Sequence, residues 1–217
     1  MYIKSIIYGL SLGVVSVPFA EAKVDVLAHD YRTLAGKERV NLQEAYGGKV
    51  VLVVNTASKC GFTPQFQALE DLHARYKARG FAVLGFPSGD FMAQEFTDEK
   101  QIQEFCTLTY GVKFPMFQKV HVKGDEATPF YKALAKAAGE APKWNFHKYL
   151  IGRDGKVVAG FGSRTKPDAP EVIAAIEAFR PDVLVFDNAG RTEQLRAAVR
   201  AGARVVFSSR APRLRWK

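Results

Sequence analysis

The chain has two cysteines, and the position of Cys60 is the first indication of chemistry. It follows the apolar run of residues 50–54 and precedes a segment, beginning at Gln65, whose apolar residues have helical spacing. Such a run is typical of a buried parallel strand. We therefore expect Cys60 between a strand and a helix, at the sheet edge where reactive groups collect. The positive end of the helix and Lys59 favour the thiolate, the nucleophilic form of cysteine. From position alone, a small buried core cysteine is an equal alternative.

The elements around Cys60 predict how it is positioned. Central strands are expected at residues 49–55 and 81–86, and Pro87 ends the second. The rest of the domain is predicted as an opening hairpin at 23–43, helices at 65–79, 98–110, 127–136 and 170–179, and a closing hairpin with strands at 146–151 and 157–161. This order predicts an α/β protein with a thioredoxin-like fold, in which helices flank a central mixed sheet.

Charge is unevenly distributed along the 217 residues, whose formal net charge is +9. Residues 180–217 contain nine Arg or Lys and three acidic residues, so this tail carries +6 and the rest of the chain is near neutral. Because 47% of the residues are hydrophobic, the chain can form one sizeable core. We expect neither a nucleic-acid partner nor stable membrane insertion.

The N-terminus has the features of a secretory signal peptide at residues 1–22. Lys4 precedes an apolar stretch at residues 6–19, and Ala20-Glu21-Ala22 is a small-x-small cleavage pattern. The alternative, an uncleaved anchor, is less favoured because the stretch is short for a bilayer and is interrupted by Ser, Gly and Pro. The sequence predicts cleavage after Ala22 and a periplasmic or secreted protein.

The basic tail at residues 180–217 predicts a small strand–helix–strand unit at residues 183–186, 192–201 and 204–207. Such a unit is too small to bury a full core alone. We favour an appended or frame-altered segment without a catalytic role, and a basic docking arm is the alternative.

The segment from Asn55 to Pro64 resembles the active-site loop of the glutathione peroxidase family, in its branch with cysteine instead of selenocysteine. The resemblance continues in the family's order and close to its spacing through Leu84-Gly85-Phe86-Pro87, Gln94-Glu95, Phe105-Cys106, Tyr110-Gly111-Val112, Phe114-Pro115-Met116-Phe117 and Lys143-Trp144-Asn145-Phe146-His147-Lys148-Tyr149-Leu150. It covers roughly residues 24–179, which suits one domain at residues 23–179. One such block would be weak evidence, but the ordered set is highly specific.

The resemblance implies a catalytic group formed by Cys60, Gln94, Trp144 and Asn145. A thiol peroxidase needs an ionised sulfur and a hydrogen-bond donor for the leaving oxygen. The amides of Gln94 and Asn145 and the indole N–H of Trp144 are neutral donors that can stabilise developing negative charge. No metal, haem or flavin is expected to take part.

The resemblance also assigns a role to Cys106, which lies on the predicted second helix and matches the resolving cysteine of thioredoxin-dependent family members. It would condense with the sulfenic acid of Cys60 to give an intramolecular disulfide, which an external dithiol then reduces. Disulfide geometry requires Cα atoms within about 7 Å, so we expect local unwinding of the helix. The alternatives are a structural disulfide, common in exported proteins, and a buried helix cysteine.

Two features depart from the usual family pattern. Ser88-Gly89-Asp90 replaces the common Cys-Asn-Gln, and Phe96 stands where a proline usually follows the glutamate. The loop that carries Gln94 is therefore expected to take a different position from the one it has in other family members. The short connection between Tyr131 and Trp144 resembles the monomeric branch, whose open site accepts bulky hydroperoxides.

The sequence therefore predicts a monomeric thiol peroxidase that reduces hydrogen peroxide and organic hydroperoxides, with lipid hydroperoxides as one candidate class. Its reductant would be a thioredoxin-like protein, and a glutathione-dependent peroxidase is the main alternative. A peroxide sensor that relays its disulfide to a partner is another. A thiol–disulfide oxidoreductase is less favoured because Thr63 occupies the second position of a Cys-x-x-Cys pair.

Overall fold

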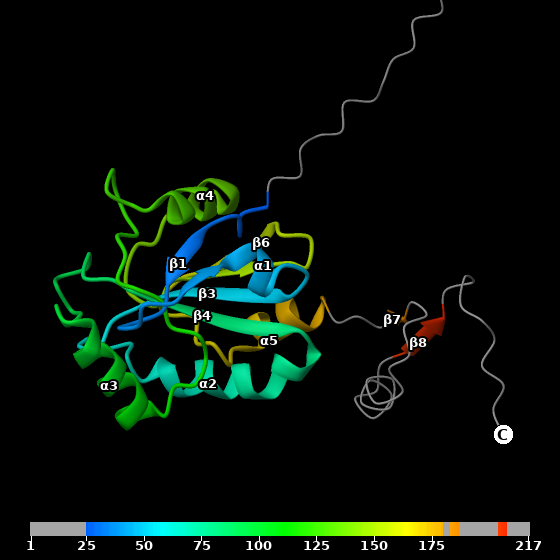
Figure 1. Cartoon of the computed structure of the whole chain (residues 1–217), viewed down its shortest axis with the longest axis horizontal. Helices are drawn as coiled ribbons and strands as arrows, with labels where there is room; N and C mark the ends of the chain where they lie inside the picture. Colours follow the sequence, from blue (N-terminus) through cyan, green and yellow to red (C-terminus); the bar gives the residue numbers. More distant parts are fainter. Residues whose placement is uncertain (1–24, 180–182, 187–203, 208–217) are drawn as a thin grey trace, which may run out of the picture.

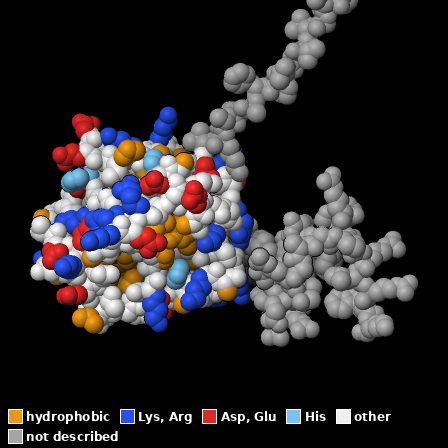
Figure 2. All heavy atoms as spheres, viewed as in Figure 1, with side chains coloured by type: hydrophobic (Ala, Val, Ile, Leu, Met, Phe, Trp, Pro, Cys, Tyr) orange, Lys and Arg blue, Asp and Glu red, His pale blue; other side chains and the backbone are white. Residues whose placement is uncertain are grey.

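The computed structural model describes residues 25–179 and two short strands at residues 183–186 and 204–207 (Figure 1). The predicted signal peptide and the helix predicted at 192–201 lie outside the described residues. Within the described part of the chain, no helix combines the length and apolar character needed to cross a bilayer. Acidic and basic side chains are interspersed on the face of the domain seen in Figure 2, as its near-neutral charge leads one to expect.

A four-stranded mixed sheet forms the centre of the domain. Its strands are β3 (Val50–Thr56), β4 (Phe81–Pro87), β5 (Lys148–Ile151) and β6 (Val157–Phe161). They lie in the order β4-β3-β5-β6. β3 and β4 are parallel, whereas the pairs β3–β5 and β5–β6 are antiparallel. The predicted thioredoxin-like α/β fold is confirmed.

Helices cover both faces of this sheet because alternate residues of β3 point in opposite directions. Val50, Leu52 and Val54 pack into a cluster with side chains of α2 (Gln65–Tyr76), α3 (Glu99–Tyr110) and α5 (Pro170–Glu177). Val51 and Val53 pack on the other side with α1 (Leu42–Tyr46) and α4 (Pro129–Ala138). Figure 1 shows α2 and α3 on one side of the sheet and α4 on the other.

Capping side chains, glycine and proline mark the ends of the helices. The Asp98 side chain accepts a hydrogen bond from the N–H of Lys100 (3.0 Å) and caps α3; of the two residues whose side chains suit this position, Thr97 and Asp98, it is the second that does so. The helix predicted at 65–79 is α-helical only to Tyr76 and ends in a 3₁₀ turn, η1 (Lys77–Arg79), before left-handed Gly80. The helix predicted at 127–136 begins at Pro129. Proline suits the first turn of a helix because its φ is already fixed near the helical value.

The free edge of β4 is covered by a neighbouring segment. Gly85 donates to the carbonyl of Pro115 and accepts from the N–H of Phe117, both at 2.9 Å. A side chain at position 85 would collide with Met116, so glycine permits this close approach.

Two further strand pairs lie outside the central sheet. The predicted opening hairpin is confirmed by β1 (Asp30–Arg32) and β2 (Arg39–Asn41), which are antiparallel. The strands predicted in the tail are also present as β7 (Val183–Phe186) and β8 (Arg204–Phe207), which pair in parallel.

Candidate active site

Cys60 lies in the connection between β3 and α2, where the sequence predicted it, and it is only 8% exposed. Thr63 shapes this connection: its hydroxyl accepts from the N–H of Cys60 (3.0 Å) and donates to the carbonyl of Ala57 (2.9 Å). The N–H of Phe62 points at the sulfur of Cys60 at 3.4 Å. A backbone donor aimed at sulfur stabilises negative charge there, as a nucleophilic thiolate requires.

Lys59 precedes Cys60 and is exposed, with its ammonium 4.1 Å from the centre of the Phe96 ring. This cation–π contact orients the lysine. Phe96 stands where proline is usual in the family, so the departure noted in the sequence supplies the ring on which Lys59 rests.

The structure brings Gln94 and Asn145 together beside the cysteine connection. Asn145 is fully buried and its Nδ2 donates to Oε1 of Gln94 at 3.0 Å. The backbone carbonyl of Gln94 accepts from the N–H of Lys59, next to Cys60, at 2.9 Å. Two residues that are 51 positions apart in the sequence are thus joined, and one of them is hydrogen-bonded to the loop of Cys60.

Trp144 and Asn145 belong to a tight turn before β5. Phe146 has φ +61°, an uncommon conformation for a non-glycine residue. Its N–H donates to the carbonyl of Asn55 (2.7 Å), and the Asn55 side chain donates to the carbonyl of Trp144 (3.1 Å). The prediction that β5 begins at residue 146 was therefore wrong: the strand begins at Lys148, because this turn redirects the chain. The turn places half-buried Trp144 against both core clusters.

Glu95 is a buried carboxyl at this site that the sequence analysis quoted in a motif without giving it a role. Its Oε1 accepts from the N–H groups of Ser58 (3.1 Å) and Phe96 (2.9 Å). Burial raises the pKa of Glu95. The residue links the loop of Cys60 to the loop of Gln94, and its place directly after Gln94 was the only available signal.

Lys148 is a second residue that the sequence analysis missed. Its side chain is fully buried, and Nζ donates to the carbonyls of Phe146 (2.7 Å) and Thr165 (2.8 Å). Burial lowers the pKa of Lys148 to about 7. Lysine is almost never fully buried without a partner, and here it fixes the turn after Asn145. A lysine at the start of an otherwise apolar strand was the signal for it.

Cys106 lies in the middle of α3 and is also buried. Burial, together with the charge of Glu95, raises the pKa of the Cys106 thiol to about 12. Cys60 and Cys106 are both free thiols that belong to the same hydrophobic cluster. At neutral pH the Cys106 sulfur is therefore protonated while it remains inside the folded helix.

The chain is similar in sequence to proteins of one known family. Residues 27–135 match the family model "Glutathione peroxidase". A hydroperoxy fatty acid reductase of Synechocystis sp. is 49% identical over 142 residues, which cover 61% of this chain and 83% of the relative. The thioredoxin/glutathione peroxidase BtuE of Escherichia coli is 40% identical over 162 residues, with 64% and 88% covered.

A solved structure supports the same assignment. The crystal structure of Trgpx in its apo form is 40% identical, with a TM-score of 0.55, and the match covers 70% of this chain and 95% of that one. The residues matched by the family model include the strand–cysteine–helix connection of Cys60, together with Gln94 and Cys106. The chain therefore belongs to the glutathione peroxidase family and is a peroxidase.

Proposed function

We propose that Cys60 is the peroxidatic nucleophile of this enzyme. Its thiolate attacks one oxygen of the hydroperoxide, the O–O bond breaks, and Cys60 becomes a sulfenic acid while the other oxygen leaves as an alkoxide or hydroxide. A proton then converts the leaving group to an alcohol or water. The observation that carries this proposal is the pair of hydrogen bonds that join Asn145 to Gln94 and Gln94 to the residue before Cys60.

Gln94, Trp144 and Asn145 serve in this proposal as neutral donors around the reacting oxygen. Preorganised donors in a site that excludes water stabilise developing charge more effectively than water does. Asn145 is fully buried and its amide orientation is fixed by Gln94. Trp144 is half-buried, with its ring 5.6 Å from that of Phe91. Both residues are therefore held in place before the substrate arrives.

Cys106 is proposed as the resolving cysteine. Its thiol attacks the sulfenic sulfur of Cys60, forming a disulfide and releasing one water, whose oxygen comes from the sulfenic acid and one of whose protons comes from the thiol. The buried thiol, with its pKa of about 12, must first leave its site. Ile102 and Cys106 are the buried side chains of α3, whereas Phe105 and Tyr110 are partly buried against the same cluster. Local unwinding around Cys106 therefore has to loosen these partial contacts as well as the two buried side chains.

The reductant that completes the cycle is proposed to be a thioredoxin-like dithiol protein, with glutathione as the alternative. The Escherichia coli relative carries both thioredoxin and glutathione in its name, and the cyanobacterial relative is named for hydroperoxy fatty acids. With the short connection before Trp144, these names support organic hydroperoxides, including lipid ones, as substrates of a monomer.

Mass spectrometry of the reduced protein tests this chemistry directly. One equivalent of hydrogen peroxide should remove two hydrogens, add no oxygen, and abolish both free thiols. Cys106→Ser should still react once and then accumulate sulfenic acid, followed by sulfinic acid under excess peroxide. Turnover of that variant with thioredoxin should fail. Wild-type turnover would instead make Cys106 a structural residue and would favour the glutathione-dependent alternative.

Export and the domain boundaries are further proposals. The support for them is the signal-like pattern at residues 1–22 and the end of the family resemblance near residue 179. N-terminal sequencing of protein recovered from the periplasm or medium should find Lys23 as the first residue. Truncation after Phe179 should leave the peroxidase rate near normal, and a collapse of activity would show that the tail is needed.

A further inference from the structure

The loop between β4 and Gln94 contains two successive residues in an unfavourable conformation. Met92 has φ +54° and Ala93 has φ +50°. A left-handed non-glycine residue costs on the order of 1 kcal/mol or more and persists only where the surroundings enforce it. Gln94, which immediately follows, needs a fixed orientation to reach Asn145. An anchor earlier in the loop therefore has to hold this conformation.

The carboxyl group of Asp90 is that anchor. Its side chain is 7% exposed, with Oδ1 2.7 Å from Nδ1 of His121. Oδ2 accepts from the backbone N–H groups of Val122 (2.6 Å) and Lys123 (3.3 Å). Burial alone would raise the pKa of Asp90, but these donors hold it below its usual value. The carboxylate thus ties the loop to the segment at residues 121–123.

Phe91 transmits this attachment to the active site. It is only 5% exposed, with its ring centre 5.6 Å from that of Trp144. The ammonium of Lys123 lies 4.8 Å from the Phe91 ring centre. Asp90 and Phe91 are therefore both held by the segment at 121–123, and Phe91 packs directly on a residue of the proposed catalytic group.

We propose that Asp90 is a positioning residue, which fastens the loop at residues 88–94 so that Phe91 supports Trp144 and Gln94 meets Asn145. This role rests on the proposed function of Cys60 and Gln94. It belongs to this chain in particular, since Asp90 lies in the Ser88-Gly89-Asp90 stretch that departs from the usual family pattern. Asp90 itself does not touch the reacting atoms.

The test measures each half-reaction separately in Asp90→Ala. Oxidation of Cys60 by peroxide should slow about tenfold, because a small misplacement of catalytic groups costs one to two orders of magnitude. Reduction of the preformed disulfide by thioredoxin should keep its wild-type rate. In a Trp216→Phe background, emission reports Trp144 alone and should shift to the red.

Glu70→Ala is the matched control, because Glu70 also accepts from two successive backbone N–H groups, those of Lys113 (2.8 Å) and Phe114 (3.1 Å). Both variants should lose stability, but only Asp90→Ala should oxidise slowly. Asp90→Asn, which keeps an acceptor oxygen, should recover part of the rate and serves if the alanine variant fails to fold.

A wild-type oxidation rate in Asp90→Ala or, failing that, Asp90→Asn would overturn the positioning role. Equal slowing in Glu70→Ala would do so as well, because the effect would then be general destabilisation. Failure of the proposed function is a different result, namely peroxide turnover that survives Cys60→Ser.

Discussion

The loop of Cys60 and the helix of Cys106 are built in opposite ways. In the loop, the hydroxyl of Thr63 makes two hydrogen bonds and the N–H of Phe62 points at the sulfur of Cys60. The carboxyl group of Glu95 accepts from the N–H of Ser58. In α3, two side chains are buried, and Leu108, two residues after Cys106, is 83% exposed. A nucleophile, the role proposed for Cys60, benefits from preorganisation, whereas a resolving thiol, the role proposed for Cys106, has to travel.

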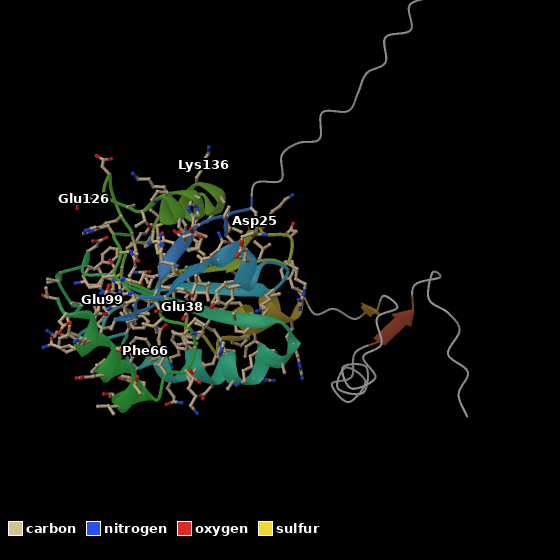
Figure 3. The ribbon with its side chains drawn as sticks, in the orientation of Figure 1. Asp25, Glu38, Phe66, Glu99, Glu126 and Lys136 are labelled. Carbon is tan, nitrogen blue, oxygen red and sulfur yellow. The ribbon has the colours of Figure 1, made fainter. Side chains whose placement is uncertain are left out.

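The first residue of α3 makes several polar contacts with other segments of the domain. Glu99, which lies at the start of the helix in Figure 3, accepts from the side chain of Arg32 (2.9 Å) and from the N–H groups of Ala35 (3.1 Å) and Lys119 (2.9 Å). The Cys60 loop is thus held by several hydrogen bonds around one residue. In α3, the polar contacts to other segments lie at the first residue, and the rest of the helix is held by apolar contacts that include the rings of Phe105 and Tyr110.

Replacing the proposed nucleophile is the most severe test of the site at Cys60. Cys60→Ser should lower peroxide consumption more than a thousandfold, on the order of the loss expected when a covalent catalyst is removed. Circular dichroism and the Tm should stay near wild type, because serine fits the space of cysteine. Substantial remaining turnover would place the peroxidatic chemistry elsewhere.

Thiol alkylation measures how well the helix protects Cys106. At pH 8, a thiol with a pKa of about 12 has a thiolate fraction roughly three orders of magnitude below that of one at 9.0. Cys106 in the Cys60→Ser background should therefore react about a thousandfold more slowly in the folded protein than in urea. Equally fast alkylation would show that α3 is open without peroxide.

The same thiol gives a stability effect with a defined sign. The pKa of Cys106 is raised in the folded state, so the contribution of its protonated thiol to the free energy of unfolding is complete below about pH 9. That contribution is lost as the pH rises toward 12. The free energy of unfolding of wild type should therefore fall more steeply above pH 9 than that of Cys106→Ala. Parallel curves would contradict this.

A hydroxyl deletion in the rigid loop should have a moderate effect. Thr63→Val leaves the N–H of Cys60 and the carbonyl of Ala57 without their partner, which costs about 1–3 kcal/mol of stability. Oxidation of Cys60 should slow about tenfold in stopped-flow measurements. Thr107→Val, at an exposed position of α3, is the control and should oxidise like wild type.

Weakening the tether of α3 should give the smallest change. Glu99→Gln removes the charge that pairs with Arg32, and stability should fall by about 1 kcal/mol. Amide exchange in α3 should quicken, and disulfide formation after peroxide addition should accelerate roughly twofold to threefold, since easier opening lowers its barrier. Glu104→Gln, exposed on the same helix, should change neither rate.

Local patterns predicted much of this frame. The apolar run of β3, the cap at Asp98 and the stop at Gly80 are signals that the chain carries within a few residues. The turn at Phe146 and the burial of Lys148 could not be predicted in this way. Both depend on partners far away in the sequence, namely the carbonyls of Asn55 and Thr165.

In the candidate site, too, the features set by local sequence could be predicted and those set by distant partners could not. The position of Cys60 follows from the strand and helix around it, but the pairing of Gln94 with Asn145 came only from the family resemblance. Periodicity does not encode which loops meet at a sheet edge. The roles of Glu95 and Asp90 were missed because a charged residue in a loop is expected to face solvent.

The covered edge of β4 has a consequence for solubility under oxidative stress. An exposed edge strand offers unpaired N–H and C=O groups to other chains and can seed aggregation. The Pro115–Phe117 segment occupies both backbone groups of Gly85. With the opening of α3 proposed above, the enzyme would pass through partly unfolded intermediates while this position of the strand stays covered and offers no template for polymerisation.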